Sequence, residues 1–327
     1  MFGTKEHTIP QPPVFKEIDT SQFKRCFIDL PYATTNDPDQ KLDIYLPDEG
    51  DGPFPLIIFV HGGGWVMGGR RNNTMPGVFK FMSQGYAMAT IEYRLAPAVH
   101  WPAPLEDVRC AIRFLRANAA QYHLDPTKFA IMGNSAGGHL ANMAAALGGR
   151  NILRGEQLGY ADVDDSVQCL ISVFSPTDIY KLDMDDWFTL FLSERQHGNI
   201  VIDSDAQDPA EKNHNIMLGF VARENPAGAA NASPINYVTE SFPPAYYLQG
   251  LRDQIVPYTQ SLSMWRKVNM VCGKSHAKLE LFPEAMHGDE AMKTDEVMNH
   301  ILDFVDAHLW EGKHERTPLP PDVKVID

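Results

Sequence analysis

The feature that most limits how this chain can fold is a Gly-Asn-Ser-Ala-Gly pentapeptide, Gly133–Gly137, between an apolar run and a stretch of small residues. The run Phe129–Met132 predicts a buried strand, and the alanine-rich segment Leu140–Leu147 predicts a helix. Glycines two positions before and after Ser135 allow the backbone to turn sharply from the strand into the helix. Because a serine on such a turn projects its hydroxyl into a cleft, Ser135 is a candidate nucleophile.

Short apolar runs recur along the chain and predict a mostly parallel sheet. The run Leu56–Val60, for example, is apolar at every position, which is typical of a strand buried on both faces. The first two candidate strands alternate more between apolar and polar residues, as an antiparallel edge pair does. The eight expected strands are Arg25–Leu30, Lys41–Leu46, Pro55–Val60, Tyr86–Tyr93, Phe129–Met132, Cys169–Phe174, Ala245–Gln249 and Lys278–Phe282.

Segments with helical periodicity alternate with these runs. In the first of them, Val108, Ile112 and Leu115 recur at helical spacing. Strands that alternate with helices indicate an α/β fold, here an eight-stranded, mostly parallel sheet with helices on both faces. The expected helices are Leu105–Ala120, Ala136–Leu147, Tyr258–Val268 and Glu290–Leu309.

The order of these elements predicts an N-terminal arm over residues 1–22 and one α/β domain over residues 23–327. From about 180 to 234 the sequence is mixed and has no strand period. A structureless loop of that length is improbable in a compact domain, so we expect a largely helical insertion at the edge of the sheet. Its aromatic residues, Trp187 and Phe188 among them, fit a lid over a pocket as well as they fit a peripheral subdomain.

Charge and composition narrow the classes of partner. The formal net charge is −14 and the basic residues do not cluster, so we expect no nucleic-acid partner. No segment approaches the roughly 20 consecutive apolar residues of a membrane span, and no signal peptide is visible at the N-terminus. The four cysteines lie far apart without a C-x-x-C pair. These features favour a cytoplasmic protein, unless a signal has been removed, and leave a homodimer open.

Sequence motifs for metals and nucleotide cofactors are missing. The chain has no H-E-x-x-H motif and no His, Asp and Glu cluster at ligand spacing. No G-x-G-x-x-G follows the first strand of a βαβ unit. We therefore expect neither a metal ion nor a cofactor.

A serine nucleophile needs hydrogen-bond donors for the oxyanion that its attack creates. The segment His61–Trp65 (His-Gly-Gly-Gly-Trp) follows an expected strand, and its glycines let backbone N–H groups bend into a cleft. The N–H of Ala136, next to the serine, is a further candidate donor. The alternatives are an ordinary turn or a phosphate loop, although a phosphate loop would need a Lys-Ser/Thr pair that is missing here.

The serine also needs a base and an acid that orients the base. His287 lies in a loop between an expected strand and the last helix, and Asp253 lies in the loop after Ala245–Gln249. Asp178 also follows a strand and is the alternative acid, but the loop of Asp253 neighbours the histidine loop in strand order. The chain order Ser, Asp, His is that of α/β-hydrolases. Two other histidines, His61 and His139, are expected to stabilise loops through hydrogen bonds.

With these residues assembled, the chain resembles the α/β-hydrolase esterases. It is most similar to the hormone-sensitive-lipase-like (bacterial family IV) carboxylesterases, and it also resembles the feruloyl and acetyl-xylan esterases. The resemblance covers about residues 25–310. Its motifs are His61–Trp65, Tyr93–Pro97, Trp101–Asp107, Gly133–His139 and the two late loops.

The resemblance implies a helical lid insertion and roles for individual residues. Ser135, Asp253 and His287 would form a catalytic triad. The oxyanion hole would be formed by Gly63, Gly64 and Ala136. We also expect Trp65, Asn134, Trp187 and Phe188 at the substrate pocket.

The implied activity is that of a serine ester hydrolase acting on small or medium acyl esters. Family IV members usually carry Asp where this chain has Asn134, and their N-terminal cap segments are longer; both departures favour the feruloyl and acetyl-xylan group. An arylformamidase or amide hydrolase would use the same triad. A non-catalytic ligand-binding protein, as the plant gibberellin receptors are, lacks the catalytic histidine, and the presence of His287 argues against that function.

Overall fold

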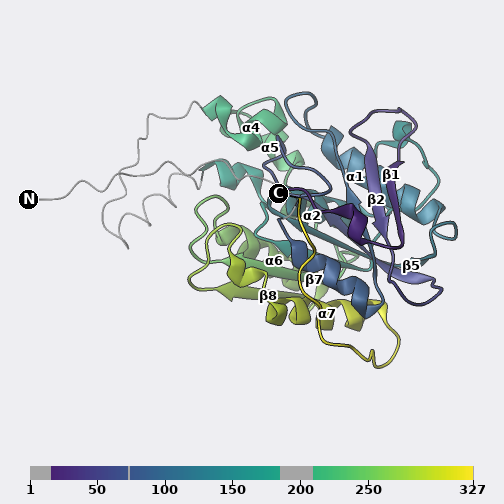
Figure 1. The fold of residues 1–327 in the computed structure, drawn as a ribbon. Coiled ribbons are helices and arrows are strands. Elements are labelled where there is room, and N and C mark those ends of the chain that lie inside the picture. The colour runs from purple at the N-terminus through teal and green to yellow at the C-terminus, as the bar shows by residue number, and fades with distance from the viewer. Residues whose placement is uncertain (1–15, 73, 185–208, 327) are drawn as a thin grey trace, which may run out of the picture.

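A computed structural model describes residues 16–72, 74–184 and 209–326. The eight strands form one sheet in the order β1-β2-β4-β3-β5-β6-β7-β8, as Figure 1 shows. The expected α/β architecture and all eight expected strands are confirmed. Their bounds are β1 Cys26–Pro31, β2 Lys41–Tyr45, β3 Phe54–Val60, β4 Ala87–Ile91, β5 Leu124–Asn134, β6 Cys169–Val173, β7 Ala245–Gly250 and β8 Ala277–Phe282.

The sheet is parallel except at one edge. Strand β2 pairs antiparallel with both β1 and β4, and every other neighbouring pair is parallel. The mainly apolar strands β3, β4 and β6 are buried along their whole length, whereas residues of β1 at the edge are partly exposed. Continuous burial requires cover on both faces of the sheet.

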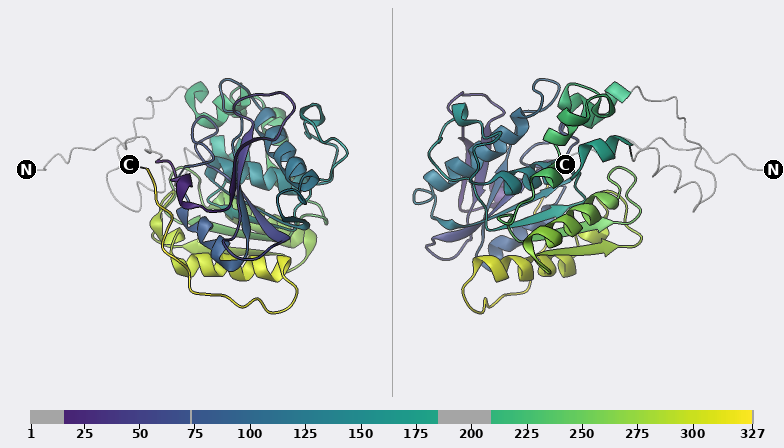
Figure 2. Two further views of the ribbon diagram at one scale, coloured as in Figure 1. Left: turned by 45° about the vertical axis from the view of Figure 1, so that its right-hand side comes forward. Right: turned by 180° about the vertical axis from the view of Figure 1, so that it is seen from behind.

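Helices supply that cover on each face. One apolar core contains residues of α1 (Ala103–Ala117), α2 (Ser135–Leu147) and α6 (Thr259–Cys272), and a second contains residues of α7 (Asp295–Leu309) and of the 3-10 helix η2 (Pro76–Gln84). Figure 2 shows α7, in yellow, along the opposite side of the sheet from α4 and α5. The helix expected from Glu290 begins later than predicted, because Glu290–Met292 forms a 3-10 turn and Thr294 caps α7. The sequence did not predict η2.

The two ends of the described chain pair with each other. The N–H of Ile326 donates to the carbonyl oxygen of Glu17 at 2.7 Å, and the N–H of Asp19 donates to that of Lys324 at 3.0 Å. On its other side the same segment pairs with the chain after β3, because the N–H of Ile18 donates to the carbonyl oxygen of Arg71 at 2.7 Å. Most of the predicted arm lies outside the described residues, and its boundary at residue 22 stays a prediction.

The insertion expected near 180–234 is largely helical in its described parts. Residues 179–184 are helical, and short helices follow from residue 209 onwards. Trp187 and Phe188 lie outside the described residues, and a lid role stays a prediction. The helices are η4 Pro209–Glu211, α4 Asn213–Leu218, η5 Ala222–Glu224, α5 Pro226–Asn231 and η6 Pro234–Tyr237; elsewhere short 3-10 turns are η1 Thr20–Gln22, η3 Glu156–Leu158 and η7 Glu290–Met292.

A close backbone contact between α2 and the end of β3 leads to a testable prediction. A methyl group on Gly137 would lie 2.2 Å from the carbonyl oxygens of both Val60 and His61, and neither backbone atom can turn away. Gly137→Ala is therefore expected to lower the free energy of unfolding by about 2–3 kcal/mol, measured by urea unfolding. Gly69→Ala is the control, because its methyl would meet only the Glu92 carboxylate at 3.5 Å. Equal stability of the two variants would contradict the close approach.

Candidate active site

Ser135 stands where β5 turns into α2. Its φ of +52° is in the left-handed region, which residues with a side chain rarely adopt. The glycines around it allow this turn, since a methyl on Gly133 would lie 2.5 Å from the carbonyl oxygen of Gly137. The turn places the hydroxyl of Ser135 at the carboxyl end of a central parallel strand, where α/β proteins bind their ligands.

His287 joins Ser135 to Asp253. Its Nε2 lies 3.0 Å from the Oγ of Ser135, and its Nδ1 lies 2.8 Å from Oδ2 of Asp253. Because a carboxylate only accepts, Nδ1 carries the proton and Nε2 is left to accept from the serine hydroxyl. The ring of Phe174 packs edge-on against the imidazole with ring centroids 4.6 Å apart. The bond to Asp253 thus selects the tautomer that a general base requires, and the Phe174 contact helps to hold the ring in place.

Asp253 is buried and surrounded by donors. Its Oδ1 accepts the backbone N–H groups of Ile255 at 2.9 Å and Val256 at 2.8 Å, and its Oδ2 accepts from Nε2 of Gln249 at 3.1 Å as well as from His287. All four partners donate, which suits an ionised carboxylate, an acceptor-only group. The polar end of β7, at Gln249, is a signal for this arrangement that sequence reasoning missed.

The glycine loop after β3 lies directly beside the serine. The N–H of Gly62 donates to Oδ1 of Asn134 at 3.0 Å, and a methyl on Gly62 would lie 3.2 Å from the Cβ of Ser135. Gly63 has a φ of +122°, and a side chain there would overlap the carbonyl oxygen of Met67. Both observations explain why the loop needs glycine. The loop is thus close enough to present N–H groups to a substrate bound at the serine hydroxyl.

Trp65, at the end of the glycine loop, is tied to α2 through a buried histidine. Nε1 of Trp65 donates to Nδ1 of His139 at 3.2 Å, and Nε2 of His139 donates to the carbonyl oxygen of Ala232 at 2.7 Å. Complete burial lowers the pKa of His139 to about 4, so the ring is neutral near pH 7. The loop-stabilising role expected for His139 is confirmed by these contacts.

His61 also stabilises the loop. Its ring stacks on Tyr93 with centroids 4.4 Å apart, and the hydroxyl of Tyr93 donates to the carbonyl oxygen of His61 at 3.0 Å. Its Nε2 lies 3.6 Å from a carboxylate oxygen of Glu92. The tyrosine belongs to one of the motifs that carry the family resemblance, and its structural role is seen here.

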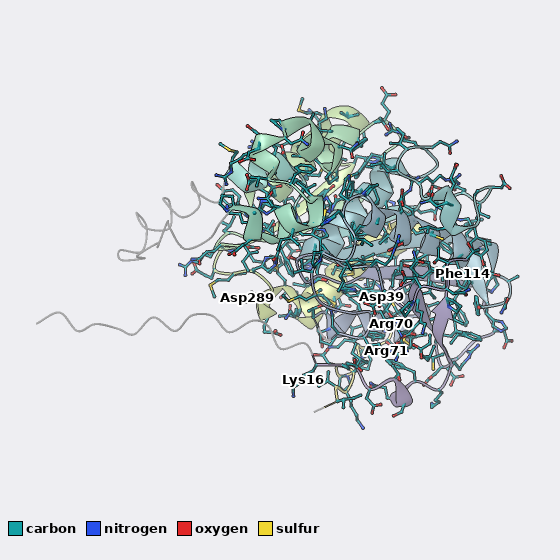
Figure 3. All side chains as sticks on the ribbon, turned by 90° about the horizontal axis from the view of Figure 1, so that it is seen from above. Lys16, Asp39, Arg70, Arg71, Phe114 and Asp289 are labelled. Atoms are coloured by element: carbon teal, nitrogen blue, oxygen red, sulfur yellow. The ribbon has the colours of Figure 1, made fainter. Side chains whose placement is uncertain are left out.

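Two arginines fix the chain that follows the glycine loop. Nε of Arg71 donates to Asp43 at 2.6 Å and Nη1 of Arg70 donates to Glu92 at 3.0 Å; both guanidinium groups also pair with Asp29. Figure 3 labels Arg70 and Arg71 side by side. These ion pairs join this segment to β1, β2 and the end of β4. A cavity of about 220 Å³ lies beside them, and none of the triad candidates lines it.

The structure thus brings together Ser135, Asp253 and His287. The alternative acid, Asp178, instead accepts the N–H of Lys181 at 3.1 Å at the start of the helix over residues 179–184. The remaining expected site residues differ in what the structure says of them. Gly63 and Gly64 lie in the loop beside Ser135, Ala136 follows it in α2, Trp65 and Asn134 are buried with partners inside the protein, and Trp187 and Phe188 lie outside the described residues.

Within residues 16–72, 74–184 and 209–326, no three His, Cys, Asp or Glu side chains lie together so that they could hold a metal ion. Over the same ranges no helix is both long and apolar enough to cross a bilayer.

A strand-turn-helix carrying a serine, followed in order by an acid and a histidine on later loops of a mostly parallel sheet, defines the α/β-hydrolase class. A comparison with protein families matches the BD-FAE family over residues 42–268. The chain belongs to the BD-FAE family.

The chain is also similar to proteins named as esterases. Esterase LipQ from Mycobacterium tuberculosis is 30% identical to this chain, over 71% of this chain and 50% of LipQ. Esterase LipC from the same organism is 30% identical over 77% of the chain and 58% of LipC. The chain thus spans about half the length of these curated relatives. Among solved structures, a truncated carbohydrate esterase from gut microbiota shares the fold, with a TM-score of 0.74 and 24% identity over 90% of this chain and 100% of that one.

The neutral His139 makes the stability of the fold depend on pH. Its pKa falls from about 6.5 in an unfolded chain to about 4 in the fold, so its contribution is complete above pH 6.5 and is lost as pH falls towards 4. Between pH 7.5 and pH 5 this loss is about 2 kcal/mol.

His139→Gln keeps an N–H for Ala232 but cannot titrate. Urea unfolding at pH 7.5 and pH 5.0 should therefore show a smaller decline for this variant than for the wild type. The control is His123→Gln, at an exposed histidine, which should decline as the wild type does. A full wild-type decline in His139→Gln would assign the pH dependence to other groups.

Proposed function

We propose that this protein is a serine hydrolase that cleaves carboxylic esters of small or medium acyl groups. The observation that carries the proposal is the position of His287, whose two ring nitrogens lie within hydrogen-bond distance of Ser135 and Asp253. This arrangement supplies a nucleophile, its base and the acid that orients the base. The similarity to LipQ and LipC, both named esterases, supports the same activity.

In the proposed first half-reaction, Oγ of Ser135 attacks the ester carbonyl carbon while Nε2 of His287 takes the hydroxyl proton. The negative charge that develops on the carbonyl oxygen is stabilised by N–H groups of Gly63, Gly64 and Ala136. When the tetrahedral intermediate collapses, His287 gives its proton to the leaving alcohol and an acyl-serine remains. Asp253 stabilises the transient imidazolium throughout.

In the second half-reaction a water molecule replaces the alcohol. His287 takes a proton from the water as its oxygen attacks the acyl carbon, and the same N–H groups hold the second oxyanion. The collapse of this intermediate returns the proton to Oγ of Ser135 and frees the acid. One residue thus serves as base and acid in turn, which its position between Ser135 and Asp253 permits.

The same triad would serve an amide or formamide hydrolase, and esters of plant polysaccharides are a further substrate class. Acetyl and feruloyl esters are favoured by the resemblance of the elbow, where Asn134 replaces the aspartate of family IV. The contact of Asn134 with Gly62 suits an uncharged amide, since the side chain accepts a hydrogen bond in a buried place. A cytoplasmic location and a homodimeric state stay predictions from the sequence; that all four cysteines are free thiols supports the former.

Removal of the nucleophile tests the reaction. Ser135→Ala is expected to reduce kcat for p-nitrophenyl acetate by about 10⁴-fold or more, and Asp253→Asn by about 10⁴-fold, because the imidazole loses its orienting acceptor. The matched control is Ser275→Ala, at an exposed serine before β8. It should keep wild-type turnover. Unchanged ester turnover by Ser135→Ala would refute the assignment.

A substrate series separates the candidate classes. With p-nitrophenyl esters of increasing chain length, we expect kcat/KM to be highest for short and medium acyl groups and to fall for long ones. Methyl ferulate, acetylated xylan and a matched anilide are assayed in parallel. Higher kcat/KM for the anilide than for the ester would favour the amide hydrolase, and activity confined to the plant esters would favour the polysaccharide class.

A further inference from the structure

A side chain from the insertion lies on the glycine loop. A Cβ built on Gly64 would be 2.2 Å from Nδ2 of Asn213, the first residue of α4, and 3.1 Å and 3.3 Å from its Cγ and Cβ. The carboxamide of Asn213 therefore rests against the bare face of Gly64. Asn213 is an exposed residue, and its side chain makes no hydrogen bond within the described ranges. An amide donor with no partner among the described residues thus lies beside the glycine loop.

Covalent geometry limits how far this donor is from the backbone N–H of Gly64. A Cβ lies about 2.5 Å from the nitrogen of its own residue, so Nδ2 of Asn213 is within about 4.7 Å of the Gly64 nitrogen. Two donors that bond the same oxygen, each about 2.9 Å away, can be up to about 5.8 Å apart. The separation of the two nitrogens therefore allows one substrate oxygen to lie within hydrogen-bond distance of both.

The helix that carries Asn213 is held by hydrogen bonds and ion pairs to the buried carboxylate of Asp183. Asp183 accepts from Nε2 of His214 at 3.0 Å, from Nδ2 of Asn215 at 3.3 Å and from Nε of Arg223 at 2.6 Å. Burial alone would raise the pKa of Asp183, but the bonds from His214 and Arg223 outweigh it and keep the pKa far below its usual range.

A second set of contacts fixes α4 from the side of the main domain. The N–H of Trp101 donates to the carbonyl oxygen of Met217 at 2.8 Å, and Nδ1 of His100 lies 2.9 Å from that of Ile216. Figure 1 shows α4 next to α5 at the same end of the molecule. A donor on a helix fixed from two sides can be preorganised, which is what stabilisation of a developing charge requires.

We propose that Asn213 is an additional donor of the oxyanion hole, supplied by the insertion, and that its Nδ2–H bonds the oxygen that Gly64 also binds. This inference rests on the proposed ester hydrolysis at Ser135. No covalent step is added: the donor stabilises the charged oxygen of both tetrahedral intermediates and releases it when the carbonyl reforms. Because the oxygen carries more charge in the transition state than in the ester, the bond acts mainly on kcat.

Two variants of Asn213 distinguish a hydrogen-bond donor from a side chain that only packs against the loop. Asn213→Ala is expected to lower kcat for p-nitrophenyl acetate by at least about tenfold with KM changed less than about twofold. Asn213→Leu keeps nearly the size and the packing on Gly64 but has neither an N–H nor a charge. We expect it to lose about as much kcat as the alanine variant. If Asn213 only packed against the loop, Asn213→Leu would stay near wild type, and that result would overturn the proposal.

Inhibition by an aryl trifluoromethyl ketone, which forms a tetrahedral adduct with a serine, gives a second measurement. The inhibition constant should rise in Asn213→Ala by about the factor by which kcat/KM falls. Asn151→Ala is the control, at an exposed asparagine beyond the end of α2 away from Ser135, and should change neither quantity. An increase in KM alone, or an unchanged inhibition constant, would contradict the donor role.

Failure of the Asn213 proposal can be told apart from failure of the proposed function. If Ser135→Ala abolishes ester turnover while both Asn213 variants behave as the wild type, the hydrolase stands and the additional donor is wrong. If Ser135→Ala leaves ester turnover unchanged, the proposed function itself is wrong, and the response to the trifluoromethyl ketone disappears in every variant.

Discussion

At Gly137 the first turn of α2 lies against the carbonyl oxygens of Val60 and His61, so close that no side chain fits between them. This contact sets the angle at which β5 enters α2, and therefore the direction of the Ser135 hydroxyl. It also brings the end of β3, and with it the glycine loop, beside the serine. A contact between backbones is less adaptable than one between side chains, because main-chain atoms have no rotamers through which to yield.

Much of the fold and of the candidate site could be predicted from the sequence. Continuous apolar runs such as Leu56–Val60 specify strands buried on both faces, and the motif around Ser135 specifies a turn with few alternatives. Asp253 was preferred over Asp178 because neighbouring strands bring their loops together, and the structure places Asp253 at His287. Sequence order was informative here because parallel strands present all their carboxyl ends at one edge.

Other features depend on tertiary contacts that leave no local pattern. The 3-10 helix η2 packs Val78 and Phe81 under the sheet without a helical period long enough to recognise. The position of Asn213 on Gly64 follows from how α4 is fixed by a carboxylate thirty residues earlier in the chain. No residue near Asn213 in the sequence indicates that its side chain contacts Gly64, so only the assembled structure reveals this contact.

The pairing of the chain ends has a consequence for the chain that follows the glycine loop. The last described residues bond to the segment around Ile18, which in turn bonds to Arg71, and Arg71 pairs with Asp43 of β2. Three backbone segments thus lie side by side, with the segment around Ile18 between Arg71 and residues 324–326. A change that displaces residues 324–326 would therefore disturb the contacts of Ile18 and, through them, the position of Arg71.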